Sequence, residues 1–239
     1  KLILLLKKQI INIGMKNLVF ASSKPWHKKS FDKFKKKLKF NCYYVSTPKQ
    51  LQLVLKKKNN FQYLFFLHWN WKISSKIHKK YECICFHMTD LPYGRGGSPL
   101  QNLILHKKKK TMVTAFRMIE KLDAGPIYFK KSMTLDGRAE EIYERVGNLC
   151  WQIINWIIKY KPSSEPQKNK PTYFNRRNPE QSLLPKKGKL SEINDFIRML
   201  DAPTYPLAFI DYGDFKLELS YPKLVDNMVE ARIVIKKKK

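Results

Sequence analysis

The chain has 239 residues, 43% of them hydrophobic and 13% aromatic, which is enough to bury the core of one domain with an appendage or of two small domains. The formal net charge is +29, but the lysines fall in short runs between periodic segments. We therefore interpret most of them as solvated surface, with binding of anionic small molecules or of nucleic acid as the remaining alternatives. No apolar run reaches the roughly 18–20 residues of a membrane span. The four cysteines form no CxxC pair and no zinc-ligand spacing, which indicates a reduced, cytoplasmic protein.

Strand-like and helix-like segments alternate from about Met15 onward. We set residues 1–14 aside as an N-terminal extension whose apolar centre is too short for a signal peptide. Short apolar runs predict strands at 17–22, 42–45, 61–67, 83–86, 112–118 and 127–133. Apolar residues at helical spacing predict helices at 31–38, 48–57 and 139–160, with shorter ones after Ser74 and at 99–105. Asp136 is expected to cap the long helix.

This alternation predicts an α/β fold, with a Rossmann-like, mainly parallel sheet and flanking helices over residues 15–160. The nearly continuous apolar run at 61–67 is typical of a strand that is covered on both faces. In such sheets the ligand lies beyond the carboxyl ends of the strands, where we expect His87 and the segment 69–72.

A polar, proline-containing stretch, KPSSEPQKNKP at 161–171, is typical of a linker. Beyond it, residues 172–239 predict a small C-terminal α+β appendage, with one helix at 191–200 capped by Ser191 and a hairpin at 207–221. The exposed helix and hairpin could pair two copies of the chain into a homodimer, and the sequence leaves this open.

Lysine is absent from residues 81–106, where Arg95 is the one strong base. The stretch contains FHMTDLPYGRGGSP at 86–99, in which a histidine ends a strand-like run and a loop with three glycines follows. A nucleic-acid-binding protein concentrates its charge on the working surface. The absence of lysine from the most distinctive loop therefore indicates a selective small-molecule site.

Two motifs, CFHMTDLPYGRGGSP at 85–99 and TAFRMIEKLDAG at 114–125, together resemble the folate-dependent formyltransferase family. That family reads approximately Asn-x-His-x-Ser-Leu-Leu-Pro-x-x-Arg-Gly-x-x-Pro and then, after a strand, Leu-Asp-x-Gly. Thr89 stands at the motif serine, and the other matching residues are Pro92, Arg95, Gly96, Pro99 and Asp123. The resemblance spans about residues 15–160, and PTYFNRR in the tail adds a weaker match to the members that act on sugars and tRNA.

The resemblance implies that a formyl group moves from 10-formyltetrahydrofolate, the co-substrate, to a primary amine. Attack of the amine on the formyl carbon gives a tetrahedral oxyanion, so the site needs a base for the amine's proton and donors for the oxygen. By the same resemblance His87 is that base or an electrostatic partner. Asp123 would orient the imidazole and stabilise its protonated form.

One departure from the family concerns Cys85, which stands where the family has its catalytic asparagine. A thiol is a weak hydrogen-bond donor, and losing an oxyanion donor costs roughly 3–4 kcal/mol of transition-state stabilisation. Thr89, Asn70 or a backbone N–H would have to substitute, or the enzyme is slow or inactive. A cysteine nucleophile that forms a formyl-thioester is a further alternative, although His87 would be its one evident base.

The acceptor amine is the second open point. Methionyl-tRNA formyltransferases carry a C-terminal barrel domain of about a hundred residues, whereas residues 172–239 are fewer and partly helical. We therefore expect a nucleotide-linked amino-deoxysugar of bacterial surface glycan biosynthesis as the acceptor. An enzyme acting on aminoacyl-tRNA and a non-catalytic descendant of the fold remain the alternatives.

Further site residues are expected around the catalytic set of His87, Asp123, Cys85 and Thr89. The resemblance implies a pterin site against the segment after residue 67, and the co-substrate-binding candidates are Asn70, Trp71, Lys72, Ile73, Leu91, Arg95 and Gly96. Aromatic residues suit stacking on a nucleobase and basic residues suit a diphosphate. The acceptor-binding candidates are Lys24, Trp26, Met88, Asp90, Tyr93, Tyr173, Phe174, Arg176 and Arg177. Simple packing is the alternative for Trp26 and Phe174.

Overall fold

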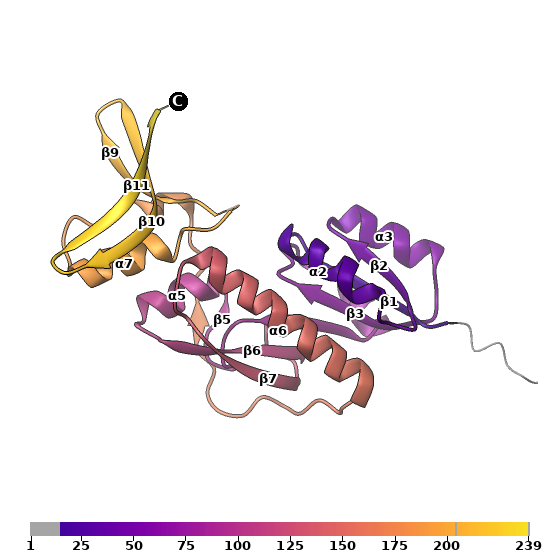
Figure 1. Ribbon diagram of the computed structural model, residues 1–239. Coiled ribbons are helices and arrows are strands. Elements are labelled where there is room, and N and C mark those ends of the chain that lie inside the picture. The colour runs from indigo at the N-terminus through magenta and orange to yellow at the C-terminus, as the bar shows by residue number, and fades with distance from the viewer. Residues whose placement is uncertain (1–14, 204, 239) are drawn as a thin grey trace, which may run out of the picture.

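The structure is a computed structural model that describes residues 15–203 and 205–238, so the expected extension at 1–14 lies outside the described residues. Its main sheet has six strands in the order β2-β1-β3-β4-β6-β7 (Figure 1). In chain order their bounds are β1 Asn17–Ala21, β2 Asn41–Val45, β3 Phe61–Leu67, β4 Cys83–His87, β6 Lys110–Arg117 and β7 Ile127–Thr134. The first four run parallel, and β6 is antiparallel to β4. The predicted mainly parallel α/β sheet is confirmed.

Helices cover both faces of this sheet, and its central strands are accordingly mostly apolar. The bounds of the helices in this part are α2 Trp26–Lys35, α3 Pro48–Lys57, α4 Ser75–Lys80, α5 Pro99–Leu105 and α6 Ala139–Tyr160. Helices α2, α5 and α6 pack on one face, whose core includes Phe20, Phe65 and Trp151. Helices α3 and α4 pack on the other face, whose core includes Val19 and Phe66. Alternate residues of one strand thus face two separate cores.

The predicted N-cap is confirmed for α3 and wrong for α6. Helix α3 begins after Thr47, as expected, and the Thr47 hydroxyl accepts a hydrogen bond from the backbone N–H of Gln50 at 3.3 Å. The expected capping of α6 by Asp136 is wrong, because Arg138 occupies the N-cap position. The Glu141 carboxylate instead accepts a 2.9 Å hydrogen bond from the Arg138 backbone N–H. A glutamate in the first turn thus provides the acceptor for the backbone donor at the N-cap.

The C-terminal region contains more β-structure than the sequence indicated. Its elements are β8 Tyr173–Phe174, the 3-10 helix η1 Pro179–Ser182, α7 Leu190–Arg198, β9 Ala208–Tyr212, β10 Phe215–Val225 and β11 Met228–Lys237. Strands β9 to β11 form an antiparallel sheet that projects from the body (Figure 1). The predicted hairpin is therefore extended by a third strand. Ser191 is not the cap of α7, since Lys189 holds that position and Ser191 lies inside the helix.

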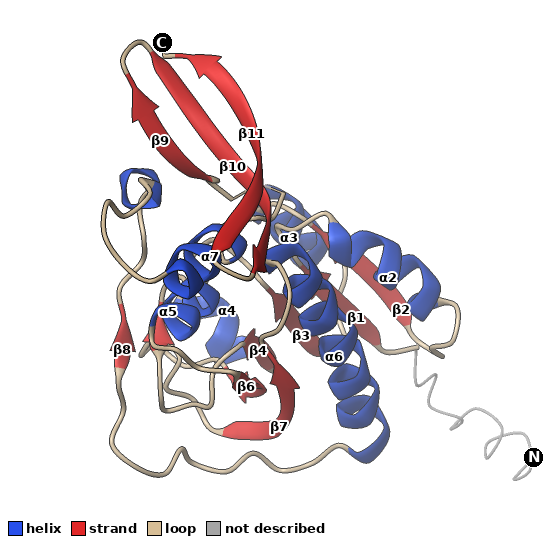
Figure 2. Ribbon diagram, turned by 60° about the vertical axis from the view of Figure 1, so that its left-hand side comes forward, coloured by secondary structure: helices blue, strands red, loops and turns tan. Residues whose placement is uncertain are grey.

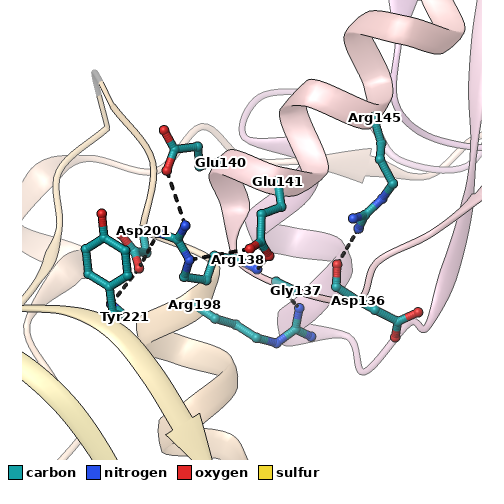
Figure 3. Close-up of polar contacts among 9 residues, drawn as sticks. All are labelled: Asp136, Gly137, Arg138, Glu140, Glu141, Arg145, Arg198, Asp201 and Tyr221. Atoms are coloured by element: carbon teal, nitrogen blue, oxygen red, sulfur yellow. Dashed lines mark hydrogen bonds and ion pairs between the residues drawn. The ribbon is translucent and has the colours of Figure 1, made fainter.

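A polar network fastens this region to the start of α6 (Figure 3). The buried Asp201 carboxylate accepts a hydrogen bond from the Arg138 guanidinium at 3.3 Å and one from the Tyr221 backbone N–H at 2.6 Å. The Arg198 guanidinium donates to the carbonyls of Leu135 and Gly137. Apolar residues of α7 join the core that α6 lines. The C-terminal region is thus packed firmly against the sheet domain.

The segment between α6 and β8 runs as an extended chain past β7 (Figure 2). The backbones of Glu165 and Ile127 exchange two hydrogen bonds, of 2.7 and 2.9 Å. The expected linker therefore lies against the edge strand of the main sheet. Within the described residues, no helix is long and apolar enough to cross a membrane.

Candidate active site

The candidate active site lies at the carboxyl ends of β3 and β4, where the loop after β4 meets the turn between β6 and β7. His87 is the last residue of β4, and the loop that follows leads to α5. Residues Arg95–Gly96 of this loop form a short strand, β5, that pairs in parallel with β8. A side chain on Gly96 would meet the carbonyl oxygen of Phe174 at 2.3 Å, and its φ of 111° also favours glycine. The tail strand thus explains why the motif needs this glycine.

His87 is held with one ring nitrogen facing the site. Its Nε2 lies 2.8 Å from the carbonyl oxygen of Gly94. Because a carbonyl only accepts hydrogen bonds, Nε2 must carry the proton. The other nitrogen, Nδ1, lies 4.0 Å from Oδ2 of Asp123, and both side chains are only about a tenth exposed. This distance is too long for a direct hydrogen bond, so Nδ1 remains an acceptor that faces a carboxylate.

Asp123 is positioned by the turn that carries it and by the loop opposite. Its φ is 50°, and its Oδ2 accepts a 2.9 Å hydrogen bond from the backbone N–H of Gly96. Two residues on, a side chain on Gly125 would meet the carbonyl oxygen of Arg117 at 1.7 Å, so this position of the turn admits only glycine. The two motifs found in the sequence are therefore in direct contact, as the resemblance implies.

Gln167, which sequence analysis missed, connects the two motifs. Its Nε2 donates to the carbonyl oxygens of Asp123 and Gly125, both at 2.8 Å. Its Oε1 accepts from Nε and a terminal nitrogen of the buried Arg95, at 3.2 and 2.7 Å. The guanidinium of Arg95, a co-substrate candidate, is thus occupied by Gln167. The polar composition of residues 161–171 gave no sign of this role.

Cys85 lies two residues before His87 and hence on the same face of β4. Burial raises the pKa of the Cys85 thiol far above its usual range, and the negative charge of Asp123 raises it further. The side chain is therefore a neutral thiol near neutral pH. A neutral thiol is a poor nucleophile and a weak donor, which argues against the thioester alternative.

Three more candidates after β4 are buried and act on the loop itself. Thr89 is fully buried and its hydroxyl lies 3.4 Å from the Gly94 carbonyl. Met88 and Leu91 belong to the buried residues, and the peptide bond between Leu91 and Pro92 is cis. These side chains shape the loop that holds His87.

The segment after β3 offers a mixed polar and aromatic surface. Its candidates Asn70, Trp71 and Lys72 are exposed, whereas Ile73 is buried. The ring of Trp69 lies 4.8 Å from that of Trp71, and the indole N–H of Trp69 is buried without a hydrogen-bond partner among the described residues. A buried unpaired donor beside an exposed ring suits a flat heterocycle with acceptor atoms, such as a pterin. These residues therefore fit the co-substrate that the family uses.

Lys24 and Arg176 are acceptor candidates from distant segments of the chain, and their side chains lie close together. Burial lowers the pKa of the Lys24 ammonium, and the positive charge of Arg176 lowers it further. The ammonium also lies 5.7 Å from the centre of the Trp26 ring. The Trp26 ring in turn stacks on Tyr143, at 5.4 Å and 14°. A cationic pair beside an aromatic ring results.

The other candidates of the tail and the glycine loop are engaged in packing. Phe174 is buried and its ring contacts that of Tyr93 at 5.4 Å. The Tyr93 hydroxyl lies 3.2 Å from Nδ1 of His106. The Arg177 guanidinium donates to the carbonyl of Gln181 and lies over the ring of Phe196. Of this group only Tyr173 is largely exposed, at 59%.

A cavity of about 470 Å³ lies between the loop after β4, β7 and the segment at 163–170. Asp90, Leu91 and Tyr93 line it on one side. The Asp90 carboxylate accepts a 2.5 Å hydrogen bond from the Lys130 ammonium, which also donates to the carbonyl of Leu91. Asp90 is therefore paired with a lysine of β7.

Comparison with known proteins finds similarity to formyltransferases. The family model described as the methionyl-tRNA formyltransferase C-terminal domain matches residues 179–236. A curated methionyl-tRNA formyltransferase from Rickettsia massiliae (strain Mtu5) is 30% identical over 145 residues, which are 57% of this chain and 46% of that protein. The chain thus spans about half the length of the curated relatives it matches.

Solved structures extend the similarity over nearly the whole chain. A methionyl-tRNA formyltransferase from Clostridium thermocellum superposes with a TM-score of 0.88 and 37% identity, covering 94% of this chain and 100% of that one. A 4-N formyltransferase from Francisella tularensis superposes with a TM-score of 0.68 at 18% identity, over 87% of this chain and 97% of that one. At such identity the second match speaks for the fold alone.

Proposed function

The chain belongs to the folate-dependent formyltransferase family, and from that premise we propose that it transfers a formyl group from 10-formyltetrahydrofolate to a primary amine. The observation that carries the proposal is the arrangement of His87. Its Nε2 is anchored on the Gly94 carbonyl, and its Nδ1 is left as an acceptor facing Asp123. This is the arrangement that a general base needs.

His87 and Asp123 have separate proposed roles in the transfer. Nδ1 of His87 takes the proton that the attacking amine loses, and the imidazolium would return a proton to the folate nitrogen that is released when its bond to the formyl carbon breaks. The Asp123 carboxylate, 4.0 Å away, stabilises the imidazolium that results. The backbone N–H of Gly96 holds that carboxylate in place, and Gln167 holds the turn that carries it.

The co-substrate would be held by the segment after β3 and by the loop after β4. Trp69 offers its unpaired indole N–H and Trp71 an exposed ring, and the backbone around Leu91 closes the other side. When bound, 10-formyltetrahydrofolate supplies the activated one-carbon group. Asn70 and Lys72 complete the proposed contact surface, and the buried Ile73 supports this segment from the core.

For the acceptor we propose a nucleotide-linked amino sugar. Lys24 and Arg176 come from separate segments and are close enough for their charges to interact, which suits the two phosphates of a nucleoside diphosphate. Trp26 lies beside them, and Tyr173 is exposed on β8 for stacking on a base. The amine of the sugar would then reach His87.

Aminoacyl-tRNA is the second candidate acceptor, and the comparisons favour it. The length of the tail no longer argues against it, because residues 179–236 match the C-terminal domain model of methionyl-tRNA formyltransferases. The Clostridium thermocellum chain that bears this name is covered completely. The net charge of +29 suits a polyanion as well.

The test is formyl transfer by the purified chain to each acceptor, followed by mass spectrometry of the product. Turnover of a nucleotide-linked amino sugar, with little effect of salt, supports the first proposal. Turnover of methionyl-tRNA, with an affinity that falls steeply as salt rises, supports the second. The double variant Lys24→Ala with Arg176→Ala should raise KM for the sugar nucleotide, whereas the solvent-facing pair Lys36→Ala with Lys57→Ala should not. No transfer to either acceptor, with no folate binding, would refute the formyltransferase proposal.

We also propose that the protein works in a reducing compartment, the cytoplasm. Cys42, Cys83, Cys85 and Cys150 are all free thiols. Thiols of this kind persist where disulfides are kept reduced.

A further inference from the structure

Two histidines form a hydrogen-bonded pair beside the candidate site. Nε2 of His27 lies 2.9 Å from Nδ1 of His68, and the two rings are stacked with their centres 5.2 Å apart. His27 lies on α2 and is fully buried, whereas His68 follows β3 and keeps some exposure. Neither residue has a role in the function proposed above.

The backbone places His68 beside His87, at the carboxyl ends of β3 and β4. β3 ends at Leu67, which pairs with Phe86 of β4, so the next residue of each strand, His68 and His87, are neighbours at the same sheet edge. His68 has a φ of 50°, a conformation uncommon for residues with side chains, and the Ser23 hydroxyl donates to its carbonyl at 2.7 Å. The centre of the His68 ring lies 6.1 Å from the centre of the Trp26 ring and 6.0 Å from that of the Tyr143 ring.

Both imidazoles of the pair are neutral near neutral pH. Burial, together with the smaller effects of the charges of Lys24 and His87, lowers the pKa of His68 to about 4. Burial lowers the pKa of His27 well below its usual value, and His68 adds to this effect. His68 therefore lies close enough to His87 for their charges to interact.

The surroundings of His27 decide which nitrogen of each ring carries the proton. Nδ1 of His27 is buried without a partner among the described residues and faces Gly147 of α6. A proton there would be a buried N–H with no acceptor, which is costlier than a bare ring nitrogen. The proton of His27 therefore sits on Nε2 and is donated to Nδ1 of His68. His68 must then carry its own proton on Nε2.

We infer that the Nε2–H of His68 is the hydrogen-bond donor to the formyl oxygen that Cys85 cannot provide. This inference rests on the formyl transfer proposed above. His68 is in this account a catalytic residue, and His27 is a positioning residue that fixes its tautomer. The enzyme thus keeps an oxyanion donor although the family asparagine is absent.

The tautomer is measured directly by nitrogen-15 NMR of histidine ring nitrogens in the wild-type chain, with His68 assigned through His68→Gln. We expect a protonated Nε2 and an unprotonated Nδ1 on His68. We also expect the Nε2–H signal to move when a stable folate analogue that carries its formyl group on N10 is added. A proton on Nδ1, or a signal that does not move on saturation, overturns the inference. This measurement needs no variant to be active.

Kinetics test the same donor through a rescue. His68→Ala should lower kcat roughly 100-fold, as loss of one oxyanion donor does, with little change in folate affinity. Adding Cys85→Asn to that variant should recover most of the loss, because the asparagine amide restores a donor at the family's position. A purely structural role of His68 would give no such rescue. The matched control is His78→Ala on α4, which should change kcat by less than about twofold.

The outcomes separate this inference from the proposed function. An active wild type whose activity survives His68→Ala, or whose His68→Ala loss is not recovered by Cys85→Asn, overturns the inference and leaves the function standing. A wild type that binds no folate and transfers no formyl group refutes the function, and the inference falls with it.

Discussion

The side chain of Gln167 donates a 2.8 Å hydrogen bond to the backbone carbonyl of Asp123. A residue of the segment between α6 and β8 therefore holds the turn that carries the proposed catalytic carboxylate. The same side chain accepts two hydrogen bonds from the buried guanidinium of Arg95. The site consequently depends on a part of the chain that lies outside both sequence motifs.

Gln167→Ala should destabilise the protein and disorder the site together. It leaves a buried guanidinium and two carbonyls without their partner, which costs about 1–3 kcal/mol. Urea unfolding measures the change, and Gln52→Ala, on the exposed face of α3, is the matched control. Equal stability of the two variants would show that water replaces Gln167 without cost.

Asp201→Ala should loosen the C-terminal region. It removes the acceptor for both Arg138 and the Tyr221 backbone N–H, so we expect a loss of about 2–3 kcal/mol. Glu140→Ala removes a more exposed partner of Arg138 and should cost less than about 1 kcal/mol. Urea unfolding and limited proteolysis of residues 179–236 read out the difference. A tail that stays resistant in Asp201→Ala would contradict this account of its docking.

The thiols should react slowly in the folded protein. Burial raises the pKa of Cys42 to about 11 and that of Cys83 to about 12, and the pKa values of Cys85 and Cys150 are raised further. At pH 8 the reactive thiolate is then at least about 100-fold scarcer than in the unfolded chain. Alkylation by iodoacetamide, mapped by mass spectrometry with and without urea, checks this. Rapid labelling of folded Cys85 would revive the formyl-thioester route.

Stability should fall as the pH drops from about 6.5 to about 4. The pKa of His68 is lowered from 6.5 to about 4 in the folded protein, so in this window the unfolded chain binds a proton that the folded chain does not. The free energy of unfolding therefore decreases with falling pH, by up to about 1.4 kcal/mol per pH unit for each such group. His27 contributes in the same direction. His68→Gln should flatten the urea-unfolding profile between pH 6.5 and 4.5, and an unchanged slope would contradict the buried neutral pair.

The sequence predicted the sheet domain well because its signals are local. Apolar runs bounded by polar turns located β3 and β4, and the start of α3 follows from Thr47 and Pro48. The two motifs located His87 and Asp123 because the family keeps their spacing. The resemblance was also enough to predict that the two motifs lie close together, as the hydrogen bond from the Gly96 N–H to Asp123 shows.

The predictions failed where distant or weak contacts decide. The predicted cap of α6 was wrong. Aspartate is a common N-cap residue, but the N-cap position here lies two residues after Asp136, at Arg138. Strand β11 is largely exposed and rich in charged residues, so its alternation is faint. The pairing of His27 with His68 spans 41 positions, and neither histidine stands in a motif. Such contacts become visible only in the folded chain.

The most direct test of the central claim compares wild type with His87→Ala and Asp123→Asn. We expect all three to bind 5-formyltetrahydrofolate with similar affinity in calorimetry, because the proposed pterin contacts lie on other residues. We expect formyl transfer to fall about 100- to 10,000-fold in both variants, since the base or its carboxylate partner is lost. The control His78→Ala should keep full activity. Full activity of His87→Ala, with its folate binding intact, would contradict the account.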